Sequence, residues 1–181
     1  MKNQLVGQKT EYQGPVFDVL SCEMILPDGR RRNYDLIKIQ NAVTILPIDE
    51  QGCIYFVRQY RIGAGKEMLE LPAGKIEEGE SALSTAEREI REEIGMAAEK
   101  LQPLGEFFVS PGYSDEYMYN FLATGLHSAP LDPDQDEFLN VIKLTPAEVR
   151  ELIASGNLQD SKSLAALFLA QPLLQAHSSR S

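Results

Sequence analysis

The residue types and spacing that could do chemistry are three glutamates, Glu89, Glu92 and Glu93, which one helix would place on a common face. Carboxylates held this close repel one another, so the cluster destabilises a helix unless a cation neutralises it. Carboxylate oxygens are the ligands that Mg²⁺ and Mn²⁺ prefer, and such ions bridge phosphate oxygens and lower the pKa of bound water. The chemistry open to this cluster is metal-assisted hydrolysis at phosphorus.

A solvated helix face is the alternative interpretation of the same spacing, with Arg88 and Glu92 as an ion pair between residues i and i+4. The apolar residues indicate which way the glutamates face. At roughly 100° per residue, one stripe gathers the predicted core residues of the helix, which are Leu83, Ala86, Ile90 and Ile94. The glutamates lie on the neighbouring stripe, roughly 110° away, which favours a groove over the solvent side of the helix.

The helix that must carry these residues is expected from Ser81 to Ile94, because Ser81 can cap its N-terminus and Gly95 can stop it. A loop that contains glycines, residues 71–80, leads into this helix. Residues 74–96 include seven acidic and three basic side chains, which account for −4 of the net charge of −10. Bound divalent cations reverse the sign of such a segment, so it remains compatible with an anionic substrate.

Strands are expected before and after this helix. Residues 16–39 predict a hairpin that turns at Asp28-Gly29, and residues 1–15 predict a tail or a short edge strand. The apolar runs at 41–48 and 53–57 predict a second, central hairpin that is buried on both faces. Further strands are expected at residues 66–71, 101–109, 117–124 and 138–144.

Two helices are expected after the last strand. The capping box Thr145-Pro-Ala-Glu148 opens a helix that stops near Gly156. Residues 164–174 are expected to form a final apolar helix, which Pro172 should end or kink. Strands, one helix, more strands and then helices predict an α/β fold, layered on a mixed sheet in a single domain.

Length and composition set broad limits on function. The 181 residues with 43% hydrophobic content suit one globular domain, and the net charge of −10 argues against nucleic acid as a partner. No apolar run reaches the ~18 residues of a membrane span and no signal-peptide pattern opens the chain, so no membrane contact is expected. Cys22 and Cys53 form no CxxC motif, which favours reduced thiols in a cytoplasmic protein, and two histidines argue against a histidine-based zinc site.

A longer motif surrounds the three glutamates. Gly74, five residues, Glu80 and seven more residues precede Arg88-Glu-Ile-Arg-Glu-Glu-Ile-Gly-Met96. Every fixed position of the signature box of Nudix hydrolases is matched, so the chain resembles that family. The resemblance implies a Nudix-like α/β/α sandwich with a mixed β-sheet. It also implies cleavage of nucleoside diphosphates linked to another moiety, with Mg²⁺ as cofactor and Mn²⁺ as an alternative.

The resemblance also implies roles for the residues of the box. The metal ligands would be Glu89, Glu92, Glu93 and the carbonyl of Ala73. Glu80 matches the first glutamate of the box. Arg88 resembles the catalytic-site arginine that orients the glutamates through ion pairs, and Glu93 is included with it among the catalytic residues.

The flanking segments resemble the ADP-ribose pyrophosphatase branch of the family. Pro111, which follows Gly95 by sixteen residues in a loop that ends at Glu116, is similar to the tag of this branch. The segment that ends at Arg61 and the Glu70 segment before the box fit the branch too. Contacts with substrate are therefore expected at Arg61, Glu70, Pro111 and Glu116. Arg61 is expected to bind the diphosphate through its guanidinium, and an ion pair with Glu70 is the alternative.

The N-terminal region, residues 1–40, is expected to be a β-hairpin region, and residues 41–181 the Nudix domain. In relatives the N-terminal region packs against the partner subunit of a homodimer, so a homodimer is expected here. Tyr12 or Phe17 from this region is the candidate for stacking on the nucleobase.

An acidic loop beyond the box commonly carries the general base in this branch. Glu137 is the candidate here, and a solvated acidic loop is the alternative interpretation. The rivals for the role of base are Asp136, Asp134 and Glu116.

The resemblance predicts a Nudix pyrophosphatase that hydrolyses a nucleoside-diphosphate sugar. ADP-ribose is the first candidate, with AMP and ribose 5-phosphate as products. The alternatives are a Nudix hydrolase of a dinucleoside polyphosphate or an oxidised nucleotide, and a nucleotide-sugar sensor without catalysis. The three intact glutamates argue against the sensor.

Overall fold

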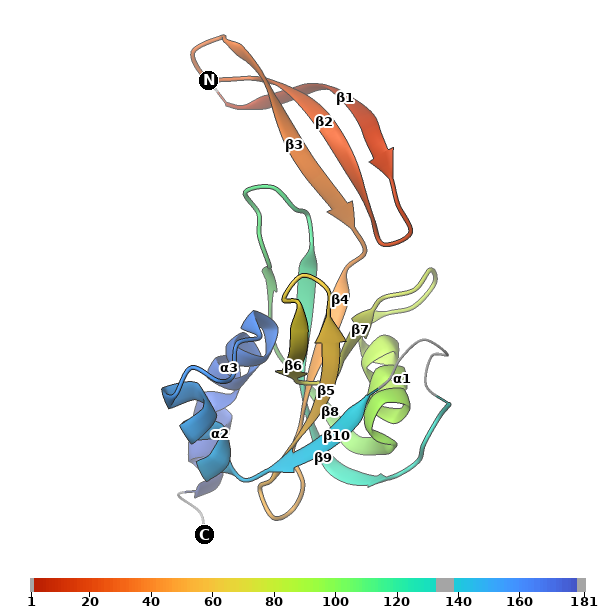
Figure 1. Cartoon of the computed structure of the whole chain (residues 1–181), viewed down its shortest axis with the longest axis vertical. Coiled ribbons are helices and arrows are strands. Elements are labelled where there is room, and N and C mark those ends of the chain that lie inside the picture. Colours follow the sequence, from red (N-terminus) through yellow and green to blue (C-terminus); the bar gives the residue numbers. More distant parts are fainter. Residues whose placement is uncertain (1, 133–138, 179–181) are drawn as a thin grey trace. The chain divides into compact units, whose positions relative to one another are not determined.

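The structure, a computed structural model, describes residues 2–132 and 139–178. The chain divides into two compact units, and Figure 1 labels their helices and strands. Unit 1 comprises Met1–Asn41 and Phe107–Tyr117, and unit 2 comprises Ala42–Glu106 and Met118–Ser181.

Unit 1 is built on a three-stranded antiparallel sheet in the order β1-β2-β3. Its strands are β1 (Gln4–Gln13), β2 (Phe17–Ile25) and β3 (Arg31–Ile39). The predicted hairpin is confirmed by the pairing of β2 with β3, whose turn includes Gly29 at a φ of 84°. The first residues are neither a tail nor a short strand, because β1 is an edge strand of ten residues. Nine of these ten residues are exposed, so no alternation of burial marked the strand in the sequence.

The segment Phe107–Tyr117 joins unit 1 by docking its loop on β3. The Ile37 N–H donates to the Tyr113 carbonyl at 2.7 Å, and the Asp115 N–H donates to the Ile37 carbonyl at 3.1 Å. The Asp115 carboxylate accepts the Ile39 N–H at 2.9 Å. Backbone groups at the end of β3 therefore hold the loop that contains Pro111.

Unit 2 contains two sheets, in the orders β10-β5-β6 and β7-β4-β9-β8. The strands of these sheets are β4 (Ala42–Pro47), β5 (Ile54–Arg61), β6 (Lys66–Glu70), β7 (Ala73–Lys75), β8 (Met96–Phe108), β9 (Tyr117–Ser128) and β10 (Asn140–Leu144). The second sheet is mixed, as predicted, because β4 runs parallel to β9 and antiparallel to β7. The short strand β7 was not predicted, and β8 begins at once after Gly95.

The predicted second hairpin is wrong. β4 and β5 follow each other in the chain but lie in different sheets, joined near their turn by the isolated bridge between Ile48 and Ile54. Five of the six residues of β4 are buried, with both faces covered. A strand that is apolar on both faces carries no signal for which neighbour it pairs with, so adjacency in sequence misled the prediction.

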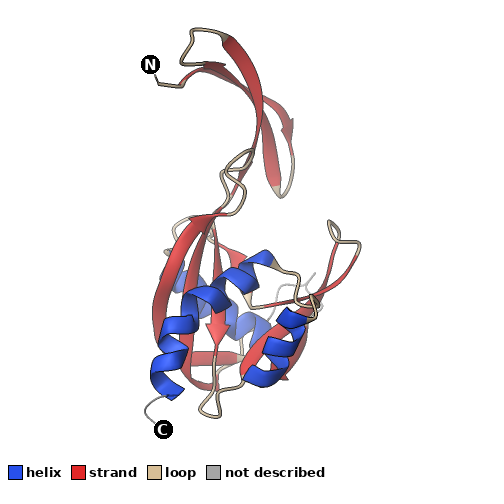
Figure 2. Cartoon of the chain, turned by 90° about the vertical axis from the view of Figure 1, so that its left-hand side faces the viewer, coloured by secondary structure: helices blue, strands red, loops and turns tan. Residues whose placement is uncertain are grey.

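In the described part of unit 2, three helices cover the strands and form the outer layers of the predicted α/β/α sandwich. Helix α1 (Ala82–Ile94) lies on one side, and α2 (Pro146–Ala154) and α3 (Ser161–Ser178) lie on the other (Figures 1 and 2). Val43 and Ile45 of β4 pack in the cluster that contains Ile90 of α1, whereas Leu46 packs with Ala166 and Ala170 of α3. Strand β4 is therefore central to both cores. No helix in the described ranges is long and apolar enough to span a membrane.

The helix ends follow the predicted capping residues. Ser81 accepts the Ser84 N–H at 3.1 Å, and Gly95 ends α1 with a φ of 70°. Thr145 and Glu148 form the predicted capping box of α2. Pro172 does not end α3, which continues to Ser178.

Candidate functional site

The buried face of α1 is centred between the apolar residues and the glutamates. Its buried residues are Thr85, Ala86, Glu89, Ile90, Glu93 and Ile94. Leu83, predicted to belong to the core, is 46% exposed. The prediction centred the buried stripe on apolar residues alone. Because Glu89 and Glu93 are buried as well, the centre of the buried face lies several tens of degrees around the helix axis from the predicted stripe, at roughly 100° per residue. Leu83 therefore lies at the edge of the buried face.

The glutamates of α1 do not form a solvated face. Glu89 is 7% exposed and Glu93 is 4% exposed. The ion pair between Arg88 and Glu92 exists, with Nη1 at 2.8 Å from Oε2, so that part of the alternative interpretation is right. A pair of buried carboxylates side by side on one helix is costly unless charges or hydrogen bonds compensate them.

The loop before α1 contacts both buried glutamates. The Ala73 N–H donates to Glu93 Oε2 at 3.0 Å. Gly74 lies so close to Glu89 that a Cβ on Gly74 would overlap its carboxyl group. Strand β7 presents these two residues to the helix, because it pairs with β4 through Ala73 and Gly74. The glycine of the box is therefore needed for a close approach between backbone and carboxylate.

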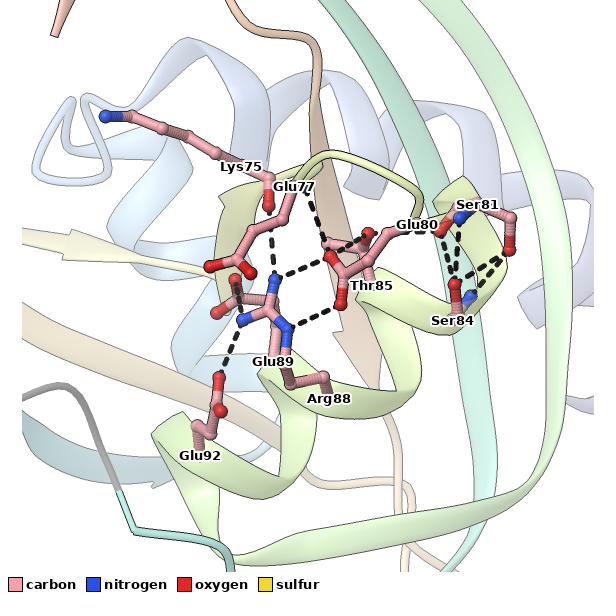
Figure 3. A network of polar contacts seen from close by, with 9 residues as sticks. All are labelled: Lys75, Glu77, Glu80, Ser81, Ser84, Thr85, Arg88, Glu89 and Glu92. Carbon is pink, nitrogen blue, oxygen red and sulfur yellow. Dashed lines mark hydrogen bonds and ion pairs between the residues drawn. The ribbon is translucent and has the colours of Figure 1, made fainter.

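Arg88 connects Glu80, Glu89 and Glu92 (Figure 3). Its Nε and Nη2 donate to the two carboxylate oxygens of Glu80, both at 2.9 Å. Its Nη1 donates to Glu89 at 2.7 Å and to Glu92 at 2.8 Å. Its Nη2 also donates to the carbonyl of Lys75 at 3.2 Å. Hydrogen bonds with Glu80 contribute most to raising the pKa of Arg88, which therefore stays a cation.

Glu80 is fixed on the other side by neutral donors. The Thr85 hydroxyl donates to Oε2 at 2.8 Å, and the Glu77 N–H donates to the same oxygen at 3.2 Å. Hydrogen bonds from Arg88, supported by those from Thr85 and Glu77, lower the pKa of Glu80 to about 2. Glu80 is thus an ionised anchor for Arg88 at neutral pH.

The donor set fits a divalent cation. The carboxylates of Glu80, Glu89 and Glu92 pair with the single guanidinium of Arg88. The carboxylate of Glu93 accepts the Ala73 N–H, so the acidic groups of the cluster outnumber its one cation. All side-chain donors are oxygens, the ligand type that Mg²⁺ and Mn²⁺ prefer. Among the described residues, no three acidic, histidine or cysteine side chains already converge as ligands. Arg88 instead bridges Glu89 and Glu92, so binding of an ion requires these carboxylates to exchange partners.

Arg61 and Glu70 form a bidentate ion pair in the sheet β10-β5-β6. Arg61 Nε donates to Glu70 Oε1 at 2.8 Å, and Nη2 donates to Oε2 at 2.7 Å. The Glu70 side chain is 2% exposed and that of Arg61 is 42% exposed. The alternative considered for Arg61 is therefore present. Its remaining nitrogen, Nη1, makes no hydrogen bond within the described residues and stays available for a further acceptor.

A polar cluster at the start of α3 was not predicted. Ser163 is fully buried, and its Oγ accepts the N–H of Leu71 at 2.7 Å. Asp160 Oδ2 accepts the Ser163 hydroxyl at 2.7 Å, and Lys162 lies 2.6 Å from Asp160 Oδ1. The sequence signal that could have been used is Asp160 itself, a favoured N-cap residue directly before α3.

The remaining predicted residues lie in unit 1 or outside the described ranges. Pro111 is exposed in unit 1, and the N–H of Glu116 donates to Ser114 Oγ at 3.1 Å. The rings of Tyr12 and Phe17 lie 6.3 Å apart in the same unit. Outside the described residues lie the candidate base Glu137 and its rivals Asp134 and Asp136.

Known proteins resemble this chain over most of its length. A family model for the NUDIX domain matches residues 38–167. An ADP-ribose pyrophosphatase of Bacillus subtilis (strain 168) is 32% identical over 92% of this chain and 91% of its own. A methanol dehydrogenase activator of Bacillus methanolicus is 35% identical over 88% of each chain. A crystal structure of an ADP compounds hydrolase superposes with a TM-score of 0.88 at 27% identity, covering 98% of this chain and 96% of that one.

Proposed function

The chain belongs to the Nudix family, and from this premise we propose that it hydrolyses the diphosphate of ADP-ribose to AMP and ribose 5-phosphate. The observation that carries the proposal is the contact of Ala73 and Gly74 with the buried carboxylates of Glu93 and Glu89. This contact suits a site for a phosphate-bound metal ion, because it restricts where two of the oxygen-bearing side chains can lie before substrate arrives. The relative named as an ADP-ribose pyrophosphatase supports the choice of substrate.

Mg²⁺ is the proposed cofactor, with Mn²⁺ as an alternative, since the Nudix family uses divalent metal ions of this kind. The residues that would hold it are Glu89, Glu92, Glu93 and the carbonyl of Ala73. When bound, the ion neutralises charge on the diphosphate and lowers the pKa of the attacking water.

Arg88 and Glu80 keep the site in place when the glutamates turn to an ion. Glu80 holds two nitrogens of Arg88, Nε and Nη2, without using Glu89 or Glu92. Arg88 Nη1 can therefore lose one carboxylate while the guanidinium stays anchored. Charge-assisted bidentate pairs of this kind are among the strongest in proteins, which suits an orienting role.

The other proposed site residues bind substrate or accept a proton. Arg61 would donate Nη1 to a diphosphate oxygen, while Glu70 keeps its plane fixed. Glu137 would take the proton of the attacking water, with Asp136, Asp134 and Glu116 as rivals. Pro111 and Glu116 are the proposed substrate contacts from the loop in unit 1, and Tyr12 or Phe17 would stack on the base.

A homodimer formed through residues 1–40 is also proposed. Sheet β1-β2-β3 exposes several large apolar side chains, which are Leu5, Val6, Tyr12, Phe17 and Tyr34. Exposed apolar residues grouped on one element favour a partner surface. Sedimentation equilibrium tests this proposal, and a monomer at micromolar concentration would contradict it.

Cys22 and Cys53 are both free thiols, which supports the cytoplasm as the proposed compartment.

The experiment that tests the proposed reaction is a substrate panel with purified protein and Mg²⁺. The panel contains ADP-ribose, other nucleoside-diphosphate sugars, dinucleoside polyphosphates and an oxidised nucleoside triphosphate. We expect the highest kcat/KM with ADP-ribose. Preference for a polyphosphate or an oxidised nucleotide would favour another Nudix activity. Binding of ADP-ribose without turnover of any member would favour a sensor.

A further inference from the structure

The segment that supplies Ala73 and Gly74 crosses from one sheet of unit 2 to the other. Strand β6 ends at Glu70 in the sheet β10-β5-β6, and β7 begins at Ala73 in the sheet β7-β4-β9-β8. Leu71 and Pro72, both buried, make the crossing. The Pro72 carbonyl accepts the Ile45 N–H at 2.8 Å, and proline has no N–H of its own. Leu71 lies between the two strands, so its buried N–H belongs to neither strand ladder and needs an acceptor elsewhere.

Ser163 of α3 accepts this N–H from a position 92 residues along the chain. The bond is 2.7 Å long, and Ser163 has no solvent exposure. The Ser163 hydroxyl in turn donates to Asp160 Oδ2 at 2.7 Å, and the Ser163 N–H donates to the same oxygen at 2.9 Å. Because its proton is committed to Asp160, the hydroxyl presents a lone pair to Leu71.

Asp160 and Lys162 extend the contact to Glu70. Burial tends to raise the pKa of Asp160, but the charge and hydrogen bond of Lys162 and the bonds from Ser163 outweigh it and lower that pKa. Lys162 Nζ lies 2.6 Å from Asp160 Oδ1 and 3.8 Å from Glu70 Oε2. The first turn of α3 thus holds two consecutive residues, Glu70 by charge and Leu71 by its backbone.

The crossing segment transmits this position to the site. Ala73 and Gly74 begin two residues after Leu71, and they contact Glu93 and Glu89 respectively. The buried N–H of Leu71 loses its acceptor if Ser163 is removed, so the crossing must shift to regain one. A shift there displaces the backbone against which both carboxylates rest.

We propose that Ser163, oriented by Asp160, is a positioning residue that sets the place of the Ala73-Gly74 backbone in the metal site. The inference rests on the proposed metal-dependent function, but it concerns ion affinity and therefore does not depend on which nucleotide is cleaved. Ser163 touches neither substrate nor ion. Its effect passes through Leu71 to the residues that would hold the ion, in the manner of outer-shell partners of metal sites.

The test compares Ser163→Ala with Ser161→Ala, a matched serine on the exposed side of the same helix turn. Mn²⁺ affinity is measured by electron paramagnetic resonance, exchange of the Leu71 amide by NMR, folding by thermal melting, and kcat and KM with ADP-ribose. For Ser163→Ala we expect faster exchange at Leu71, a dissociation constant for Mn²⁺ raised about tenfold, and a lower kcat with a smaller change in KM. Ser161→Ala should match the wild type in every measurement.

Several results would overturn the inference or separate it from the proposed function. Folded Ser163→Ala protein with wild-type affinity for Mn²⁺ would refute the positioning role. If that variant does not melt cooperatively, Asp160→Ala, which keeps the Ser163 hydroxyl but removes the oxygen that orients it, takes its place. Unchanged Mn²⁺ affinity in folded Asp160→Ala would then refute the role equally. Wild-type protein that binds Mn²⁺ but does not cleave ADP-ribose would reject the proposed substrate and leave the affinity comparison valid.

Discussion

The Cα of Gly74 lies against the carboxyl group of Glu89, so closely that a Cβ would overlap it. The position requires glycine for reasons of space and not of backbone conformation, since the φ of Gly74 is not among the positive values found at other glycines. A backbone loop and a buried carboxylate that share this space fix each other. This relationship connects the loop of the box with its helix, as the ion pair of Arg88 with Glu80 also does.

Gly74→Ala is predicted to lower kcat with ADP-ribose by about 10²-fold, because an added methyl group moves Glu89 by an ångström or so. Gly63→Ala is the matched control, as a Cβ on Gly63 meets no atom within 4 Å and its φ is not positive. Steady-state kinetics and thermal melting of both variants test this prediction. Near-equal rates in the two folded variants would show that the close approach does not matter for turnover.

Glu93→Gln is predicted to reduce Mg²⁺-dependent turnover by at least about 10²-fold. Loss of a residue that only supports a metal ligand can cost about 10²-fold, and loss of a ligand itself should cost at least as much. The amide keeps an acceptor for the Ala73 N–H, so the fold is expected to survive. Turnover and binding of ADP-ribose are measured separately. Intact turnover would count against Glu93 as a ligand.

Glu137→Gln is predicted to lower kcat by about 10²-fold or more, as expected for loss of a general base. Asp134→Asn in the same acidic segment serves as the comparison, and its effect is expected to be small. The measurement is kcat as a function of pH, because loss of the base should also remove the acidic limb of the profile. A larger effect at Asp134 would transfer the role to that residue.

Glu80→Gln is predicted to flatten the dependence of stability on pH in acid. The pKa of Glu80 is lowered from 4.5 to about 2, so the unfolded state binds more protons between these values. The stability that Glu80 contributes is present above about pH 4.5 and is lost as the pH falls through about 2. Urea unfolding of metal-free protein at several pH values should show the gap between wild type and variant closing over this range. Glu78→Gln, at an exposed position of the same loop, is the control, and a gap that stays constant to pH 2 would refute the assignment.

Arg61→Lys is predicted to raise KM for ADP-ribose about tenfold, the effect of losing one interaction of about 1.4 kcal/mol. Lysine keeps the charge but cannot hold Glu70 with two nitrogens and offer a third to the diphosphate. Arg58→Lys, an exposed arginine earlier on β5, should leave KM unchanged. If both variants bind ADP-ribose as tightly as wild type does, Arg61 serves only the ion pair with Glu70.

Local signals in the sequence predicted the centre of the site well. Ser81 and Gly95 bound α1 because capping depends on residues within one helical turn. The pair of Arg88 and Glu92 follows from helical spacing alone. The order of elements predicted an α/β fold on a mixed sheet, and the resemblance to the Nudix family supplied the α/β/α layering.

Contacts between residues far apart in sequence could not be predicted in the same way. β4 and β5 lie in different sheets. The sequence could not predict this, because the apolar faces of the two strands do not specify a neighbour. The exposed position of Leu83 follows from burial of charged residues that no hydrophobic pattern places inside. The bond between Leu71 and Ser163 depends on where α3 packs, which the sequence around either residue does not encode.

Hydrolysis of ADP-ribose in ¹⁸O-labelled water tests the central claim most directly. With wild-type protein and Mg²⁺ we predict AMP and ribose 5-phosphate in equal amounts, with one ¹⁸O atom in one of the two products. We predict no product with a chelator and almost none with Glu93→Gln. Absence of monophosphates from the wild type, or labelled products that persist in Glu93→Gln, would contradict the account.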